Sequence, residues 1–433
     1  AVYKLGAVLN PINVMLTPSE VEFVVNDCKA KAIIASPEKG LPLLPVVATS
    51  EVEAIVLFGS DVHAGTVPFD TLLQSKGDVP KIAAPDAEDL STICYTSGTT
   101  GRPKGAMQTH RAVVSNAIGT AKMHGRTEGD VTVSALPCPH VYANVVMNSA
   151  FLCGMTLVLH ERFDPDACLS SISKHRATIF EGVPTMYMYM LNSPLIKSID
   201  LSSLNRCTVG GQTMPVSTME NVVATFGCPL IELWGMTEVA GLGATHPIGV
   251  SRMGSIGVAL PDMELRIADP DNVNVTNAVD TVGELVARGP MVTKGYFGDP
   301  NRTREALSDD GWLRTGDLAK MDADGYVWIV DRLKDMILTG GFNIYPAEIE
   351  RILSMHPAVA MSAVGKVEDA LKGETARAYV VLKPETTVTA EGITTFCRTH
   401  LAAYKVPRSV RFVADLPKTS TGKIMRRELH TLD

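Results

Sequence analysis

The chain has 433 residues, of which 45% are hydrophobic and 20% charged, and its formal net charge is −8. This composition is typical of a globular protein with more than one domain, and the acidic balance argues against a nucleic-acid partner, since such binders carry a basic excess. The longest nearly apolar run, 145–159, is interrupted by Asn148, Ser149 and Gly154, so no transmembrane segment is expected. Peripheral membrane association and the oligomeric state stay open.

Eight cysteines are scattered along the chain without a C-x-x-C pair. This pattern favours free thiols in a reducing compartment over a disulfide framework or a zinc site. We therefore expect a cytoplasmic protein.

The first ninety residues alternate helix-like and strand-like segments. Residues 17–20 (T-P-S-E) have the hydroxyl-then-acid spacing of a helix start. The short apolar runs 32–35 and 54–58 are typical of buried parallel strands. Alternation of this kind predicts an α/β layered fold.

Residues 95–105 (Y-T-S-G-T-T-G-R-P-K-G) form a loop rich in glycine and hydroxyl groups, between an expected strand at 90–95 and an expected helix from His110. Glycines let backbone N–H groups turn toward an anion, and hydroxyls and a lysine add donors, so the loop suits phosphate. Lys104 stands between Pro103 and Gly105, which does not match G-x-x-x-x-G-K-[ST], so a P-loop kinase is the weakest alternative. A flexible surface loop is the other interpretation.

This loop resembles the phosphate-loop motif of the adenylate-forming superfamily, which includes acyl-CoA synthetases, luciferases and the adenylation domains of peptide synthetases. Five further motifs follow in the family's order: L-W-G-M-T-E at 233–238, G-W-L-R-T-G-D at 311–317, D-R-L-K-D at 331–335, G-G-F-N-I-Y-P-A-E-I-E at 340–350 and P-K-T-S-T-G-K at 417–423. Six matches in one order arise rarely by chance. The chain is identified as a member of this superfamily, most similar to medium- and long-chain fatty acid CoA ligases.

The resemblance implies a large layered α/β N-terminal domain and a small mobile α+β C-terminal domain. We expect the boundary after residue 331, giving domains 1–331 and 332–433, with the hinge at Lys334 and with Arg332 touching the nucleotide. The chain begins at Ala1 without Met, inside the part that resembles the large domain, so we expect that domain to be truncated at its start.

The resemblance also implies a site for ATP and Mg²⁺. Thr237 would bind the α-phosphate, Glu238 would be the metal ligand, Trp234 with Gly235 would hold adenine, and Asp317 would accept from both ribose hydroxyls. The residues implied to cradle phosphates are Thr96, Ser97, Gly98, Thr99, Thr100, Gly101 and Lys104. The loop implied to contact the acyl group and adenine is Gly210, Gly211 and Gln212, where Gln212 replaces a more usual small residue.

Two further residues carry catalytic expectations from the resemblance. Lys423 would reach the carboxylate and the α-phosphate and offset charge in the transition state. His140 would position the acyl group, although a histidine in such a place is more often structural. Lys418, Arg426 and Arg427 make the tail locally basic, and there we expect a solvated face or, alternatively, a contact with the phosphates of coenzyme A.

The expected reaction is activation of a carboxylic acid as acyl-AMP with release of pyrophosphate, followed by transfer to coenzyme A. The segment 137–144 contains no acid, so an α-amino acid, whose buried ammonium would lack a counter-charge, is a poor substrate candidate. The methionine-rich run 186–191 is either plain core or the lining of a fatty-acyl site. Two alternatives stay open: transfer of the acyl group to a carrier protein or another acceptor, and an incompetent fragment that binds nucleotide or acyl chains without turnover.

Overall fold

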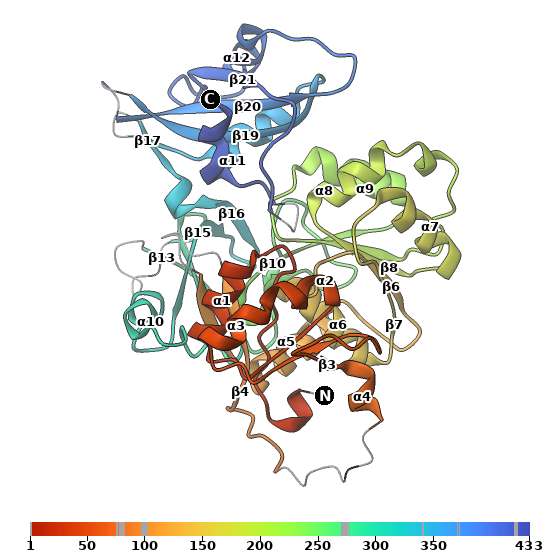
Figure 1. Cartoon of the computed structure of the whole chain (residues 1–433). Helices are drawn as coiled ribbons and strands as arrows, with labels where there is room; N and C mark the ends of the chain where they lie inside the picture. Colours follow the sequence, from red (N-terminus) through yellow and green to blue (C-terminus); the bar gives the residue numbers. More distant parts are fainter. Residues whose placement is uncertain are drawn as a thin grey trace.

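The computed structural model describes residues 2–74, 77, 83–96, 103–269, 276, 278–339, 342–369, 371, 373–419 and 423–433. The described strands form five sheets, and Figure 1 shows the C-terminal elements gathered at one end of the molecule, beyond β16. Most of the chain lies in the mixed α/β body below them. The α/β fold class predicted from the sequence is confirmed.

A small parallel sheet forms first, from local signals. Thr17 caps α1 (Pro18–Asp27): its hydroxyl accepts from the N–H of Glu20, whose carboxylate accepts in turn from the N–H of Thr17, so the predicted capping box is confirmed. The two apolar runs pair in parallel as β1 (Ala32–Ala35) and β2 (Ala54–Leu57), and β3 (Val67–Pro68) extends the sheet. Short helices complete this layer: α2 (Pro37–Gly40), α3 (Leu44–Thr49) and α4 (Phe69–Leu73).

The largest sheet has seven strands in the order β12-β11-β10-β9-β8-β6-β7. Its parallel strands are β6 (Val131–Ser134), β7 (Thr156–Leu159), β8 (Ile179–Gly182), β9 (Arg206–Val209) and β10 (Leu230–Met236). Two antiparallel strands, β11 (Gly241–Thr245) and β12 (Val258–Ala259), continue it beyond β10. The helices of this region are α5 (His110–Met123), α6 (Val141–Cys153), α7 (Pro165–His175), α8 (Pro184–Asn192) and α9 (Val216–Phe226).

The main core lies between these helices and the sheet. Phe180 on β8 and Tyr187 on α8 are fully buried there and meet edge to face, with ring centroids 5.3 Å apart. Burying two aromatic side chains of this size contributes a large share of the local stability. This core fixes the position of the sheet's carboxyl edge.

The segment after the phosphate loop contains one strand that was not predicted from the sequence. β4 (Leu90–Thr96) pairs antiparallel with β5 (Lys104–Thr109), which places Lys104 opposite Thr96, and α5 begins only after β5. The strand expected at 90–95 and the helix expected from His110 are therefore confirmed, whereas the strand β5 between them was not predicted. The strand forms because non-local partners occupy its backbone: β4 on one side and, for Met107, the carbonyl of Gly295, which is 2.9 Å from its nitrogen.

An antiparallel sheet leads toward the C-terminal region. Its strands are β13 (Glu264–Ala268), β14 (Gly283–Arg288), β15 (Leu313–Met321) and β16 (Val327–Arg332), in that order, and α10 (Pro300–Ala306) precedes β15. The strands predicted at 264–268 and 283–288 are confirmed.

The last sheet has the order β18-β17-β20-β19, and β21 also pairs with β20, in parallel. Its elements are β17 (Ile337–Thr339), β18 (Phe342–Ile344), α11 (Pro346–Ser354), β19 (Val359–Asp369), β20 (Gly373–Leu382), α12 (Ala390–Arg398) and β21 (Ser409–Phe412). The tail ends in a 3₁₀ helix, η6 (Arg426–Leu432). A separate hydrophobic cluster, from Ile337 to Val406, fills this part. It is consistent with the boundary expected after residue 331, which stays a prediction.

Among the described residues, no helix is both long and apolar enough to span a bilayer.

Candidate active site

The carboxyl edge of the large sheet gathers three of the predicted site segments. β6, β9 and β10 run parallel, so the residues that follow them emerge at the same edge. His140 lies six residues after β6, Gly210 follows β9 directly, and Thr237 follows β10. A crevice outside the carboxyl ends of parallel strands is the usual ligand site of open α/β sheets.

Lys423 reaches this edge from the C-terminal region. Its Nζ lies 3.3 Å from Nε2 of His140, and a Cβ added to Gly211 would lie 3.0 Å from its Cε. Gly211 also has a φ of +88°, which an L side chain rarely adopts. Glycine at this position therefore leaves room for the lysine.

The electrostatics of this contact follow from its burial. Burial, with the nearby Arg332 guanidinium adding to it, lowers the pKa of Lys423 to about 8. Burial and the Lys423 ammonium lower the pKa of His140 to about 3, so the imidazole is neutral. An ammonium held under these conditions is poised to receive an anion.

Lys104 and Glu238 meet at a third residue, Tyr296. The Tyr296 hydroxyl donates to Oε1 of Glu238 at 2.8 Å and accepts from Nζ of Lys104. Nζ of Lys104 also lies 3.6 Å from Oε1 of Glu238 and 4.0 Å from the centroid of the Tyr296 ring. Burial, followed by the Glu238 charge, raises the pKa of Tyr296. The sequence analysis missed Tyr296, which lies 192 residues from Lys104 and carries no local signal.

The turn that carries Thr237 and Glu238 is held by two buried amides. Gln108 donates to the carbonyl of Thr237 at 2.9 Å. Asn116 donates to the carbonyls of Val239 and Leu242, at 3.0 and 2.7 Å, and its Oδ1 accepts from the N–H of Leu242. These bonds fix the carboxylate of Glu238, which is 5% exposed. Gln108 and Asn116 were also missed, because their partners are distant in sequence.

Trp234, Asp317 and Arg332 form a second cluster. The indole N–H of Trp234 donates to Oδ2 of Asp317 at 2.8 Å, and Arg332 forms an ion pair with Oδ1. Asp317 is 3% exposed; burial raises its pKa, while Arg332 and Trp234 oppose that rise. The side chain expected to stack on adenine therefore also orients the carboxylate expected to bind ribose; both roles stay predictions.

The remaining predicted residues lie as follows. Ser97, Gly98, Thr99, Thr100 and Gly101 are outside the described residues, as are residues 340–341 and 420–422. Thr96 ends β4, and its buried hydroxyl has no hydrogen-bond partner among the described residues. Gly235 packs so closely that an added Cβ would lie 2.0 Å from the carbonyl oxygen of Gly241. Gln212 is partly exposed in the turn after β9. Lys334 lies in the 3₁₀ turn η5 (Leu333–Asp335), and burial lowers its pKa.

These groups fit a nucleoside triphosphate with a divalent cation. Lys104 and Lys423 supply cations for phosphate, the Thr96 hydroxyl, which has no partner among the described residues, supplies a donor, and Glu238 offers a hard oxygen ligand. No group of three or more His, Cys, Asp and Glu side chains able to hold a metal occurs among the described residues. A Mg²⁺ held by one carboxylate and by substrate phosphates needs no such cluster.

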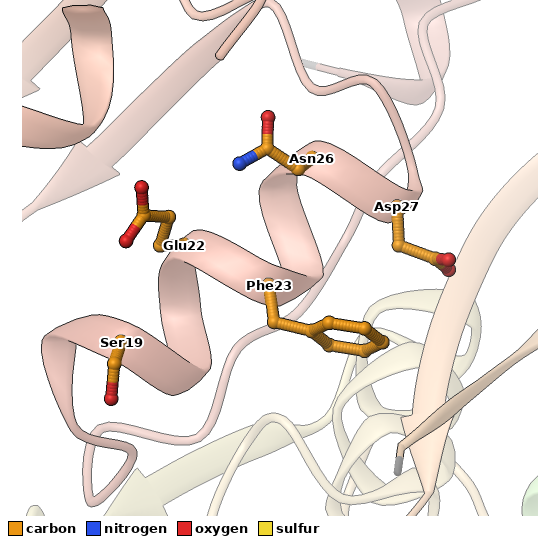
Figure 2. A pocket seen from close by; sticks show the side chains of 5 residues that line it. All are labelled: Ser19, Glu22, Phe23, Asn26 and Asp27. Atoms are coloured by element: carbon orange, nitrogen blue, oxygen red, sulfur yellow. The ribbon is translucent and has the colours of Figure 1, made fainter. Parts of the chain in front are cut away.

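A pocket on α1 does not belong to this site. Figure 2 shows its lining side chains, all on α1: Ser19, Glu22, Phe23, Asn26 and Asp27. None of the predicted site residues is among them. Asp27 accepts a hydrogen bond from Tyr95 on β4, so α1 supports the strand that leads into the phosphate loop.

Comparison with known proteins gives the family. Residues 1–297 match the family described as AMP-binding enzyme, and residues 348–423 match the AMP-binding enzyme C-terminal domain. The long-chain-fatty-acid–CoA ligase of Bacillus subtilis (strain 168) is 34% identical over 98% of this chain and 81% of its own length. The feruloyl-CoA synthase of an Amycolatopsis species is 36% identical over 98% of this chain and 84% of its own length.

A solved structure agrees over the whole chain. ATP-bound MatB from Rhodopseudomonas palustris superposes with a TM-score of 0.92 and 32% sequence identity, covering 100% of this chain and 84% of that one. The sequence motifs, the arrangement at the sheet edge and these matches point to one family. The chain belongs to the AMP-binding enzymes, the adenylate-forming superfamily.

Proposed function

We propose that the chain is an ATP-dependent acyl-CoA ligase. It activates a carboxylic acid, in first place a fatty acid, as acyl-AMP and then transfers the acyl group to coenzyme A. The observation that carries the proposal is the meeting of Lys423 with His140 and Gly211 at the carboxyl edge of the sheet. The relatives named as long-chain-fatty-acid and feruloyl CoA ligases support it.

In the first step, a carboxylate oxygen of the acid attacks the α-phosphorus of ATP and pyrophosphate leaves. The protein positions the reactants and offsets negative charge, and it forms no covalent intermediate with them. Lys423 places its ammonium where charge develops, and neutral His140 orients the acid without competing for its negative charge. Glu238, oriented by Tyr296, would hold Mg²⁺, and the ion would supply positive charge to offset that of the phosphates.

In the second step, the thiol of coenzyme A attacks the acyl carbonyl and AMP leaves. Lys423 fills the space beside Gly211 in the present arrangement, and we propose that the C-terminal domain turns away before the thiol approaches. The turn at 333–335 is the proposed hinge, with the backbone of Lys334 taking the change.

An aryl carboxylic acid is the second substrate candidate. The feruloyl-CoA synthase matches this chain at 36% identity, as well as the fatty acid ligases do. In addition, Met186 and Met190 are buried in the main core next to Tyr187. This favours the interpretation of the methionine-rich run as core, and weakens it as an argument for a fatty-acyl site.

The test is pyrophosphate release from ATP and Mg²⁺ with a panel of acids: acetate, octanoate, palmitate, a coumarate-type acid and an amino acid, each with and without coenzyme A. We expect one acid class to dominate, with sustained turnover only when coenzyme A is present. If a carrier protein without coenzyme A gave the same turnover as coenzyme A, the carrier protein would be favoured as the acyl acceptor. No pyrophosphate release with any acid, despite measurable ATP binding, would refute the proposed activity for this chain.

A further inference from the structure

Arg426 lies three residues after Lys423 and is surrounded by carboxylates. Its Nε is 3.1 Å from Oε1 of Glu350, and its Nη2 pairs with the other oxygen of the same carboxylate. Its Nη1 lies 3.0 Å from Oδ1 of Asp331 and 3.3 Å from Oδ2 of Asp335. The solvated face expected for this arginine is therefore wrong: its side chain is 23% exposed.

The three carboxylates come from both sides of the proposed hinge. Asp331 belongs to β16, where it pairs with Leu318 of the antiparallel sheet. Glu350 lies on α11, within the C-terminal region, and Asp335 ends the hinge turn. Arg426 thus ties the last strand before the hinge to a helix after it.

Two backbone amides complete the same arrangement. The N–H of Ala347, at the start of α11, donates to Oδ2 of Asp331 at 2.8 Å. The N–H of Val364, on β19, donates to Oε1 of Glu350 at 2.8 Å. Asp331 is 3% exposed, so without Arg426 its carboxylate would keep backbone donors but lose its counter-charge. We call Arg426, Asp331 and Glu350 the clasp.

The clasp depends on the orientation that brings Lys423 to His140. A turn of the C-terminal domain about residues 333–335 moves α11 and Arg426 relative to β16, and charge-assisted bonds of about 3 Å do not survive such a displacement. The clasp can therefore stabilise only one of the two orientations that the proposed reaction needs.

We propose that Arg426 is a positioning residue for the first half-reaction: through Asp331 and Glu350 it holds the C-terminal domain in the orientation that inserts Lys423. This inference rests on the proposed function. It assigns the arginine no contact with substrate. Loss of the clasp slows adenylation and leaves acyl transfer from preformed acyl-AMP to coenzyme A little changed.

The experiment measures the two half-reactions separately in Arg426→Gln, Arg426→Lys and Asp331→Asn. We expect Arg426→Gln to slow pyrophosphate release about 10- to 100-fold, and thioester formation from supplied acyl-AMP by less than about threefold. In Arg426→Lys, pyrophosphate release is faster than in Arg426→Gln because lysine keeps the positive charge. In the double variant Arg426→Gln with Asp331→Asn, the losses do not add, since both remove one interaction.

The matched control is Lys405→Gln. Lys405 forms an ion pair of similar burial with Glu348 of α11, at 2.8 Å, and both lie in the C-terminal region. This variant leaves both half-reactions unchanged. An equal fall of both rates in Arg426→Gln, or no fall in either, would overturn the inference.

A second readout does not depend on activity. Hydrogen exchange of peptides that contain the amides of Ala347 and Val364 reports the clasp directly. We expect faster exchange of both in Arg426→Gln and unchanged exchange in Lys405→Gln. If the parent chain activates no acid, the proposed function fails, while unchanged exchange in Arg426→Gln would refute the clasp by itself.

Discussion

Replacing Lys423 by alanine removes the ammonium that reaches His140, and the structure gives the size of the effect. The pKa of this lysine is lowered from 10.5 to about 8, mainly by burial. A change of one in pKa corresponds to about 1.4 kcal/mol, so keeping the lysine protonated in this site costs about 3 kcal/mol of free energy. The negative charge of the reacting groups offsets that cost, so Lys423→Ala is expected to slow adenylation about 100-fold. Loss of one preorganised donor at a developing charge has a similar effect in other enzymes.

The assay is single-turnover pyrophosphate release at saturating ATP and acid. Lys405→Ala is the control, because that lysine pairs with Glu348 away from the sheet edge. ATP binding is measured in parallel, and we expect it to weaken by less than about tenfold, since Lys423 acts mainly in the transition state. Lys423→Ala with more than about a third of the parent rate would refute the role assigned to this lysine.

Three more outcomes are expected. The pKa of Lys423 is about 8 and that of His140 is about 3. The rate of pyrophosphate release should therefore fall as the pH rises through about 8, where the ammonium of Lys423 loses its proton. A rate that rises there, or a titration between pH 5 and 7 that His140→Gln removes, would contradict this assignment. Glu181→Ala leaves Arg126, its partner at 2.8 Å and 1% exposed, without a counter-charge, so urea unfolding should show a loss of about 3–5 kcal/mol; a loss under about 1 kcal/mol would be inconsistent. Tyr296→Phe removes the hydroxyl that donates to the proposed magnesium ligand, and should raise the Mg²⁺ concentration for half-maximal rate about tenfold; an unchanged Mg²⁺ dependence would exclude this orienting role.

Local signals in the sequence predicted the elements whose stability is local. The capping box at Thr17 and Glu20 predicted the start of α1 because both hydrogen bonds form within one turn. The apolar runs 32–35 and 54–58 predicted parallel strands, and β1 and β2 pair in parallel; the burial expected of both is found for β2, whereas Ile34 of β1 is 51% exposed.

Features that depend on distant partners were not predicted. The strand that Lys104 starts is bonded to Gly295 through the N–H of Met107, and Tyr296 approaches Lys104 from 192 residues away. The basic tail suggested a solvated face, yet Arg426 meets Asp331, which is 95 residues away in the sequence. The spacing of residues within a motif does not predict contacts between distant segments. The motifs therefore located the candidate site, whereas its supporting residues were identified only from the structure.

The most direct test of the account is a two-stage single-turnover experiment with ATP labelled at the α-phosphate and the best acid of the panel. Without coenzyme A, the account predicts that labelled acyl-AMP accumulates on the protein with one equivalent of pyrophosphate. Added coenzyme A should then convert it to acyl-CoA and labelled AMP at the rate of steady turnover. Release of labelled ADP, or acyl-CoA formed without a preceding acyl-AMP, would contradict the two-step route.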